Sequence, residues 1–408
     1  MRAVKFGGSS VADAVKLRAA GAQLARLRER GPAPVAIVSA MAGVTDGLLR
    51  VAESATRGES VWPDALQALR ARHADAYRAL AGDIPGAFIA QWADVERDAR
   101  DLTDLARVAP LADGARELAV ARFSGWGERL AAPLLAAAVS VAGAPPYAVT
   151  DAPILLNARE RADVTPEPSV LASRGWLLPR LAMPAMRGAI PILPGYIARD
   201  ADGRLTTMGR NSSDLTASVI AAALGAISLT IYSDVHGIYT ADPRVVQDAT
   251  LIPALTYDEA TRIAALGAKA LHPRAVAPLA AAAIPLELRA AFAPDAPGTN
   301  IGPAGRIARQ RTRRAAWVVA ARPSAAGDVV DVTALRLPAW PADDAACDCA
   351  ERAARGLTRE GLSLSTVAQD EIVVRVPRAQ ANETVRALHA TLAGCAGRHA
   401  QVEIAAGA

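Results

Sequence analysis

The stretch Val4-Lys5-Phe6-Gly7-Gly8-Ser9-Ser10 decides how the N-terminal part of this chain folds. Apolar residues across 2–6 predict a short buried strand, and apolar positions three and four apart from 11 to 28 predict a helix. A strand, a glycine-containing turn and a helix in succession are typical of a right-handed crossover in a parallel sheet. The stretch therefore predicts an α/β fold with its first strand-end turn at the glycine pair.

This glycine pair is also a candidate anion site. Gly7 and Gly8 carry no Cβ atom, so their N–H groups could approach an anion closely, and the following helix would direct its positive end to the same place. Glycine is equally common in any tight turn from strand to helix, and the GxxxxGK[ST] spacing of a P-loop is absent. From the turn alone, a phosphate site and a plain turn are equally good interpretations.

Lysine is rare in this chain, because the 45 Lys and Arg residues include only three lysines: Lys5, Lys16 and Lys269. A solvated cation can be either residue, whereas a compact ammonium that reaches a phosphate oxygen cannot be replaced by a planar guanidinium without a change of geometry. Lys5 lies directly before the glycine pair, which favours the phosphate site. Lys5 and Lys269 could instead be lysines that remain by chance in an arginine-rich chain. Chance is the favoured explanation for Lys16.

Apolar periodicity continues the α/β pattern to about residue 304. Further buried strands are predicted at 35–39, 190–196, 228–233 and 285–288. Helical patterns begin near Val44, cover 62–108 as a lid or an inserted hairpin, and form one long alanine-rich helix at 117–141. Open sheets of this kind bind ligands at the carboxyl ends of their strands, so the turns there are the candidate site.

The turn at 39–46 consists mainly of small residues, which leaves room for a ligand, and it carries Thr45 at a helix start. A helix cap is the simpler explanation for Thr45. A polar loop at 233–244 follows another buried strand.

The stretch 206–214 is the most polar of these turns and precedes an apolar helix at 215–224. Ser213 or Asp214 could cap that helix, but capping needs one polar residue and leaves the others unexplained. Arg210 suits bidentate capture of a carboxylate. This turn is therefore a candidate substrate site.

The composition allows a large enzyme with two domains. The chain has 408 residues, of which 52% are hydrophobic and 21% charged, enough for two sizeable cores. A net charge of +4 with interspersed signs, and only four Phe and six Tyr, argue against nucleic-acid binding. Five arginines at 306–314 are more simply a solvated linker or helix face.

No membrane or secretory signal is found in the sequence. No apolar run reaches the roughly 18 residues that a membrane span needs, and the N-terminus enters a strand rather than a signal peptide. Cys347, Cys349 and Cys395 are too few for a disulfide framework and lack a zinc-ligand cluster. A cytoplasmic protein is expected.

Several of these stretches occur together in the order and approximate spacing of the aspartate kinases of the amino-acid kinase family, which the chain resembles from residue 1 to about 302. The matching stretches are 5–10, 39–46, Gly127-Glu128, 209–214, 233–246, 267–273 and 297–302. Several blocks in order are more specific than any single one. The resemblance implies a three-layer α/β sandwich that uses ATP and Mg²⁺ to phosphorylate the side-chain carboxylate of aspartate, giving 4-phospho-aspartate.

The resemblance also implies roles for individual residues. It makes Lys5 and Asp214 the catalytic pair, in which Asp214 orients Lys5. The residues implied to hold the nucleotide and its phosphates are Gly7, Gly8, Ser9, Ser233, Asp234, Tyr239, Arg244 and Lys269. The residues implied to bind the substrate are Thr45, Glu128, Arg210 and Ser213, with Arg210 on a carboxylate and Glu128 on the ammonium. Phosphate oxygens and water would be the main Mg²⁺ ligands, so no protein metal ligand is assigned.

Three departures from the family pattern lie on the substrate side. Asn211-Ser212 stands where the family commonly has two glycines or Asn-Gly, Leu215 replaces an aromatic residue, and Pro194-Gly195-Tyr196 replaces Thr-Gly-Phe. A same-fold kinase acting on another amino acid or small acidic substrate is therefore the alternative. A non-catalytic nucleotide-binding regulator is disfavoured, because Lys5, Asp214 and Lys269 are all present.

The C-terminal part predicts a shortened regulatory region. The family carries two ACT domains, which are βαββαβ units, but only 106 residues follow residue 302 here. We expect a catalytic domain at 1–304, a linker at 305–328 with a remnant strand at 316–321, and one ACT-like domain at 329–408. Its predicted strands are 329–337, 362–367, 371–376 and 401–405, and its predicted helices are 344–360 and 379–392.

The expected effector site in this region is incomplete. The family's effector turn contains a glycine, and 338–344 has none, although Gln369 stands where the family often has a glutamine. Weak feedback regulation and pairing into a homodimer through the ACT-like domain are therefore expected.

Overall fold

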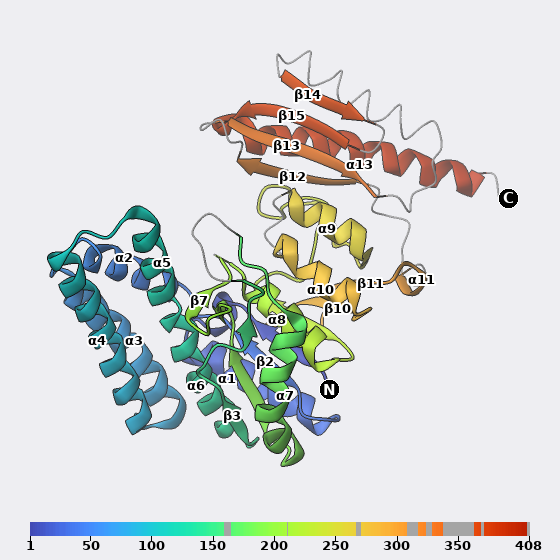
Figure 1. The fold of residues 1–408 in the computed structure, drawn as a ribbon. Coiled ribbons are helices and arrows are strands. Elements are labelled where there is room, and N and C mark those ends of the chain that lie inside the picture. Colours follow the sequence, from blue (N-terminus) through green and yellow to red (C-terminus); the bar gives the residue numbers. More distant parts are fainter. Residues whose placement is uncertain are drawn as a thin grey trace. The chain divides into compact units, whose positions relative to one another are not determined.

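The computed structural model (Figure 1) describes residues 1–158, 165–209, 211–266, 271–307, 317–323, 329–337, 363–368 and 371–405. The chain forms two compact units, Met1–Val235 with Ala275–Ala296, and His236–Arg274 with Pro297–Ala408. The functional domain boundaries expected at 304 and 328 stay a prediction.

The first unit is built on a parallel sheet (Figure 1). Its strands are β1 (Ala3–Phe6), β2 (Val35–Val38), β3 (Pro146–Ala148), β5 (Ile190–Pro194), β8 (Leu229–Ser233) and β10 (Leu286–Ala290). They lie in the order β3-β5-β2-β1-β8-β10, and every neighbouring pair is parallel. The residues of β1, β2 and β5 are buried throughout, as expected for parallel strands covered on both faces. The strands predicted at 2–6, 35–39, 190–196, 228–233 and 285–288 are confirmed.

Helices cover both faces of this sheet. The helices of the unit are η1 (Gly8–Val11), α1 (Ala14–Glu29), α2 (Val44–Ala55), α3 (Trp62–Ala81), α4 (Gly86–Val108), α5 (Asp113–Ser124), α6 (Trp126–Val141), α7 (Val170–Met186), α8 (Ser213–Leu224) and α10 (Val276–Ala281), the last preceded by η2 (Pro273–Ala275). Val4 and Phe6 share one core with α1 and α6. Side chains alternate along a strand, so Lys5 faces the other layer, which contains α7, α8 and α10. The predicted three-layer α/β sandwich is confirmed.

The segment predicted as a lid or inserted hairpin is a helical hairpin of α3 and α4. Trp62 Nε1 donates a hydrogen bond to Thr103 Oγ1 at 3.0 Å near one end of the pair. The rings of Tyr77 and Phe88 pack edge to face near the other end, with centroids 5.3 Å apart. Side-chain contacts therefore join the two helices along their length.

The single helix predicted at 117–141 is wrong, because two helices, α5 and α6, meet at Gly125. A methyl group on Gly125 would lie 2.6 Å from Cγ2 of Ile197, so a side chain at this position would collide with Ile197. Ile197 belongs to a small second sheet of β4 (Ile154–Leu155), β6 (Ile197–Arg199) and β7 (Leu205–Thr207). A contact distant in sequence therefore requires glycine at the position where the two helices meet.

The second unit contains two separate sets of strands. In the first, β9 (Ala254–Thr256) and β11 (Thr299–Gly302) pair in parallel beside α9 (Tyr257–Ala265) and α11 (Ala304–Ile307). In the second, β12 (Trp317–Pro323), β13 (Val329–Arg336), β15 (Glu371–Pro377) and β14 (Ser363–Ala368) form an antiparallel sheet in that order. After η3 (Arg378–Gln380), helix α13 (Ala381–Ala405) packs against this antiparallel sheet.

The core of the antiparallel sheet extends to the loop that follows β8. Val332, Val374 and Leu388 are fully buried in one cluster with Ala241 and Val246. The N–H of Val319 donates to Thr240 O at 2.8 Å, and the Thr240 hydroxyl lies 3.0 Å from Nε2 of His389 on α13. The loop and the C-terminal sheet are thus one packed body.

Two C-terminal predictions change. The strand predicted at 401–405 is wrong, because α13 continues as a helix to Ala405. The remnant strand predicted at 316–321 is β12, which pairs antiparallel with β13 and forms an edge of the same sheet. The predicted helix at 344–360, the turn at 338–344 and Gln369 lie outside the described residues.

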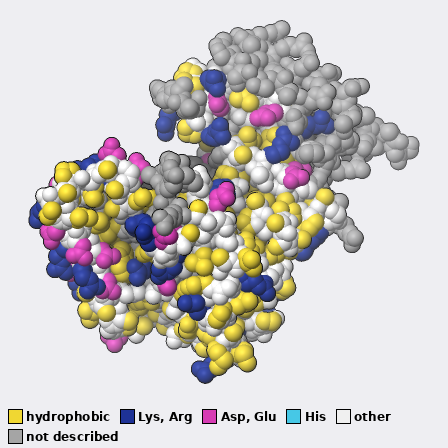
Figure 2. Space-filling view, in the orientation of Figure 1, with side chains coloured by type: hydrophobic (Ala, Val, Ile, Leu, Met, Phe, Trp, Pro, Cys, Tyr) yellow, Lys and Arg dark blue, Asp and Glu magenta, His cyan; other side chains and the backbone are white. Residues whose placement is uncertain are grey.

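The surface carries mixed charges. On the face shown in Figure 2, Lys and Arg side chains lie interspersed with Asp and Glu side chains. Among the described residues, no helix combines the length and the apolar character that crossing a bilayer requires.

Gly21 tests the packing of α1 on α6. A methyl group on Gly21 would lie 2.5 Å from the carbonyl carbon and oxygen of Ala138 in α6. We expect Gly21→Ala to lower the free energy of unfolding by about 1–3 kcal/mol, as overpacking usually does, in spite of its better helix propensity. Urea titration followed by circular dichroism measures this loss.

The matched control is Gly175→Ala on α7, where an added methyl group would meet nothing within 4 Å. This variant should be unchanged or up to about 1 kcal/mol more stable. Equal stability of the two variants would show that α1 and α6 do not pack as closely as described.

Candidate active site

The buried ion pair between Lys5 and Asp214 is the centre of the candidate site. Lys5 Nζ lies 2.6 Å from Oδ1 of Asp214, and the two side chains are only 10% and 14% exposed. Asp214 stands in the first turn of α8, where the helix dipole also stabilises a carboxylate. The structure therefore brings together the two residues predicted as the catalytic pair.

The glycine turn lies beside the Lys5 ammonium. A methyl group on Gly7 would be 3.6 Å from Lys5 Nζ and 4.0 Å from Ser9 Oγ. The Gly7 N–H donates to Tyr232 O at 3.1 Å, which extends the pairing of β1 with β8. Gly8 opens η1, and amides in the first turn of a helix have no partner within it. Of the two glycine amides, the Gly8 N–H is thus the one that can face an anion.

The turn after β2 packs directly on this glycine turn. A methyl group on Gly8 would lie 2.7 Å from Ala40 O, and the Ala42 N–H donates to Gly8 O at 3.2 Å. A methyl group on Gly127 would lie 2.7 Å from Ala40 Cβ, so α6 approaches the same turn from its other side. Thr45 follows in the first turn of α2, half-buried.

Glu128 is a buried carboxyl group at the start of α6, and it is only 4% exposed. Burial raises the pKa of Glu128 to about 8, although a hydrogen bond from the Ala40 backbone and the charge of Lys5 both act to lower it. Its Oε2 atom has no hydrogen-bond partner among the described residues. A buried carboxyl with an unused acceptor suits an ammonium group that arrives with a substrate.

The start of α8 packs on the turn after β5. A methyl group on Gly195 would lie 2.8 Å from Ser213 Oγ, so glycine is required for this approach. Tyr196 has a φ of 64°, its N–H donates to Thr216 Oγ1 at 2.9 Å, and its hydroxyl lies 2.9 Å from Ser124 Oγ. Tyr196, a departure from the family pattern, is therefore held at both ends.

The polar turn before α8 bends sharply. Asn211 has a φ of 61°, a left-handed conformation that Asn tolerates better than most residues. Ser212 is fully buried, and its carbonyl accepts hydrogen bonds from the Thr216 N–H and hydroxyl. The predicted substrate residue Arg210 lies outside the described residues.

The residues predicted on the nucleotide side are spread over both units. Ser233, at the end of β8, donates its hydroxyl hydrogen to Val235 O at 3.0 Å and accepts from the Val235 N–H, which makes a local turn. Asp234 is exposed. Tyr239 forms a bridge with Leu251 in the second unit.

Arg244 pairs with Asp242 in the same loop of the second unit, through two nitrogen–oxygen contacts of 3.0 Å. Lys269 lies outside the described residues. The structure therefore supplies no geometry that joins Arg244 or Lys269 to the residues around Lys5.

The sequence did not identify the backbone groups that form part of the site. It also did not identify the glycines whose lack of a side chain lets two segments approach closely. Ala40 lies in the small-residue turn at 39–46 that the sequence singled out, but nothing in the sequence shows that its main chain would contact Gly8. Gly195 shows a weak signal, since it follows a buried strand end directly. Ser10, also unassigned, is buried and donates its hydroxyl hydrogen to Tyr232 O at 3.3 Å.

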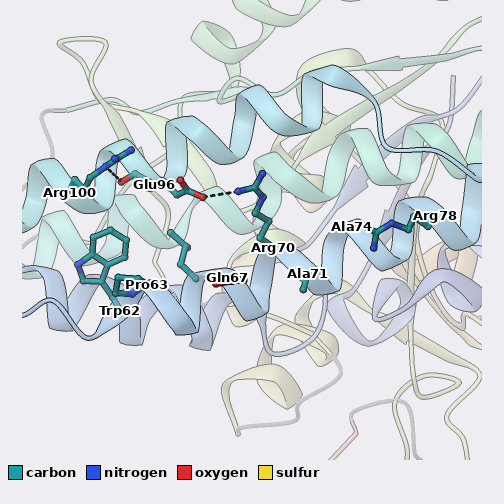
Figure 3. Close-up of a pocket in the computed structure, with 10 residues that line it drawn as sticks. Trp62, Pro63, Gln67, Arg70, Ala71, Ala74, Arg78, Glu96 and Arg100 are labelled. Carbon is teal, nitrogen blue, oxygen red and sulfur yellow. Dashed lines mark hydrogen bonds and ion pairs between the residues drawn. The ribbon is translucent and has the colours of Figure 1, made fainter.

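A hollow in the first unit lies on the α3–α4 hairpin, away from these turns (Figure 3). Its volume is about 680 Å³, and the residues that line it include Trp62, Arg70, Arg78, Glu96 and Arg100. Arg70 Nη1 lies 3.1 Å from Glu96 Oε1 across it. It contains none of the predicted site residues, so its size does not identify it as the catalytic site.

A family model and curated relatives match most of this chain in sequence. Residues 1–289 match the family model described as the amino acid kinase family. Bifunctional aspartokinase/homoserine dehydrogenase 2 of Escherichia coli (strain K12) is 35% identical over 302 residues, which are 73% of this chain and 35% of that protein. The aspartokinase of Chlamydia pneumoniae is 28% identical over 297 residues, which are 72% of this chain and 61% of that protein. The chain thus spans about a third and about three fifths of the lengths of these two relatives.

Solved aspartate kinases have the same fold. The structure of E. coli aspartokinase III in complex with aspartate and ADP superposes with a TM-score of 0.75 at 21% identity, and covers 96% of this chain and 99% of that one. The aspartate kinase of Clostridium acetobutylicum gives a TM-score of 0.70 at 16% identity, and covers 96% of this chain and 100% of that one. Because the family model covers well over half of the sequence and these folds agree with it, the chain belongs to the amino acid kinase family.

Proposed function

We propose that this chain is an aspartate kinase, which transfers the γ-phosphoryl group of ATP to the side-chain carboxylate of aspartate and forms 4-phospho-aspartate. The observation that carries the proposal is the buried Lys5–Asp214 pair beside the Gly7-Gly8 turn. Relatives named aspartokinase, and a similar fold solved with aspartate and ADP, support it.

The reaction requires positive charge more than it requires a base. A carboxylate is already nucleophilic, so the difficulty is to bring two anions together and to stabilise charge on the transferring group. Lys5 and the Gly8 amide would hold the γ-phosphoryl oxygens, with Gly7 and Ser9 shaping the turn around them. Asp214 would keep the Lys5 ammonium in place through its 2.6 Å contact.

The substrate would be held on the opposite side of Lys5. Glu128 would receive the substrate ammonium, and Arg210 would hold a substrate carboxylate through paired hydrogen bonds. Thr45 and Ser213 would supply hydroxyl groups at the starts of α2 and α8.

The nucleotide would be bound mainly by the region after β8. We assign Ser233, Asp234, Tyr239, Arg244 and Lys269 to this side of the site. Mg²⁺ is a hard cation that takes oxygen ligands, which the phosphates and water provide, and it would neutralise phosphate charge during transfer.

The same proposal extends to the organisation of the chain. Residues 1–304 would form the catalytic domain and 329–408 an ACT-like domain, joined by 305–328, with two chains paired through the ACT-like domains in a cytoplasmic homodimer. Feedback regulation would be weak, because the 338–344 stretch lacks a glycine. Saturable inhibition by lysine or threonine below millimolar concentration would contradict this.

A panel of acceptors tests the function. Purified protein is incubated with ATP, Mg²⁺ and hydroxylamine, which traps an acyl phosphate, and with aspartate, glutamate or related amino acids. We expect hydroxamate from aspartate at a rate well above that from any other acceptor. A higher rate with another amino acid would reassign the substrate, and no turnover with any acceptor would refute a kinase.

Lys5→Arg should reduce turnover about 10²–10³-fold, because the larger planar guanidinium cannot place a point charge at the same position. The control is Lys16→Arg on α1, whose ammonium lies 3.9 Å from Asp13 at the surface. Both variants should show the circular dichroism of the wild type. Near-normal activity of Lys5→Arg would remove Lys5 from the site.

The apparent affinity for aspartate should depend on pH through Glu128. With a pKa of about 8 the empty site holds a neutral carboxyl group at pH 7, and the substrate ammonium must displace its proton. The KM for aspartate should therefore fall as pH rises from 6.5 towards 8, by up to about tenfold per pH unit, and then level off. The substrate amino group stays protonated over this range.

Glu128→Gln is the variant that isolates this effect. It should raise the KM for aspartate and make that KM independent of pH. The KM for ATP should change little. A KM for aspartate that keeps its pH dependence in Glu128→Gln would assign the titration to another group.

A further inference from the structure

Arg72, on helix α3, contacts two of the turns that form the candidate site. Its Nη1 donates to Ala42 O at 2.7 Å, and its Nη2 donates to Ala12 O at 2.8 Å. Ala12 directly follows η1, which begins at Gly8, and Ala42 lies in the turn between β2 and α2. One guanidinium therefore spans two segments that are distant in sequence.

These two turns also contact each other through their backbones. The Ala42 N–H donates to Gly8 O at 3.2 Å, and Ala40 O approaches Gly8 so closely that a methyl group there would lie 2.7 Å away. Ala42 thus bonds to both neighbours, to Arg72 through its C=O and to Gly8 through its N–H. Arg72 therefore holds the same residue that contacts Gly8, and it fixes the position of that residue relative to Ala12.

The contact requires the shape of an arginine side chain. The guanidinium is planar and carries its donors at fixed positions, so two carbonyl oxygens can be held at a set separation. A lysine ammonium keeps the charge but concentrates its donors on one atom. Hydrogen bonds from a charged donor contribute more to stability than neutral ones.

Helix α3 gives Arg72 a rigid base. Its neighbour His73 is fully buried, packs edge to face on Trp92 of α4, and hydrogen-bonds to Leu69 O at 2.8 Å. Arg18 of α1 donates to Ala79 O at 2.6 Å, which attaches the far end of α3 to the layer of helices on the sheet. These contacts make the hairpin a fixed support rather than a lid.

We propose that Arg72 is a positioning residue that fixes the distance between the phosphoryl-binding turn at Gly8 and the acceptor-binding turn at Thr45. This inference rests on the proposed function, which assigns Gly8 and Thr45 to opposite sides of the transfer. The two side-chain hydrogen bonds of Arg72 both go to backbone oxygens. Its removal leaves each turn present but loosens one against the other, and a misplacement of about 1 Å can cost roughly 10²-fold in rate.

The test compares Arg72→Ala, Arg72→Lys and the control Arg78→Ala. Arg78 lies on the same helix, is exposed, and pairs only locally with Asp75 at 2.8 Å. We expect kcat of Arg72→Ala to fall about 10–100-fold, with the KM values for ATP and aspartate within about threefold of wild type. Arg72→Lys should be intermediate, and Arg78→Ala should match wild type.

Hydrogen exchange read by mass spectrometry separates positioning from general destabilisation. In Arg72→Ala, exchange should accelerate in the peptides covering 7–13 and 39–47, with α6 and β5 unchanged. If Arg72→Ala does not fold, hydrogen exchange of the same peptides is measured in Arg72→Lys instead. A kcat equal to that of Arg78→Ala, or acceleration spread evenly over the unit, would overturn the proposal.

The same design distinguishes failure of this inference from failure of the proposed function. If wild-type protein prefers another acceptor, the three variants are compared with that acceptor and the expected ratios are the same. If wild-type protein has no kinase activity, the exchange of 7–13 and 39–47 still reports whether Arg72 holds the turns together. Unchanged exchange in both peptides would overturn the proposal in either case.

Discussion

The buried ion pair of Lys5 with Asp214 is the constraint on which the arrangement of this unit depends. An ammonium in the middle of a buried parallel strand must be compensated, and removing one partner of such a pair typically costs about 3–5 kcal/mol. The compensation comes from α8, whose first turn must therefore meet the carboxyl end of β1. Because Val4 and Phe6 face α1 and α6, the charge sits on the face they do not occupy. One residue thus links the two helical layers through the sheet.

The other groups around Lys5 are positioned by glycines at which two segments of the chain approach closely. Gly8 on Ala40, Gly127 on Ala40 and Gly195 on Ser213 are contacts in which a methyl group would come within 2.8 Å of its neighbour. Each contact brings a strand-end turn or a helix start to the surroundings of Lys5. The buried Glu128 carboxyl depends on this packing, since its hydrogen bond comes from the Ala40 backbone. A buried acceptor such as its Oε2, which has no partner among the described residues, destabilises the fold, and such groups are typical of binding sites.

The sequence predicted the elements that have a strong local signal. The buried strands and the glycine turn rest on short stretches whose character is set by adjacent residues, whereas the pairing of Lys5 with Asp214 was implied by the resemblance to the aspartate kinases. The break at Gly125 was missed because it depends on Ile197, some seventy residues away in the chain. The helix at 401–405 was missed because a short apolar run is compatible with either a strand or the continuation of a helix.

Other features could not be read from sequence because the groups involved have no distinctive side chain. Ala40 acts through its main chain, and Arg72 is one of many arginines with no motif around it. The loop at 236–246 gave a nucleotide signal but no sign that it packs into the core of the C-terminal sheet through Ala241 and Val246. That packing could not be predicted from the sequence, because small and β-branched residues are common in any loop that returns to a core.

The use of lysine and arginine in this chain now has a structural explanation. Lys5 stands where a single compact charge lies between a carboxylate and the glycine turn, and an ammonium can serve both from one atom. Arg72 stands where two carbonyl oxygens from separate turns must be held apart at a fixed distance, which needs donors on separate atoms of a rigid plane. In a chain that otherwise uses arginine for nearly every cation, the exchange of one for the other at either position would alter geometry rather than charge. Under the proposed function, Lys5 would supply charge at the glycine turn, and Arg72 would set the spacing between that turn and the turn after β2.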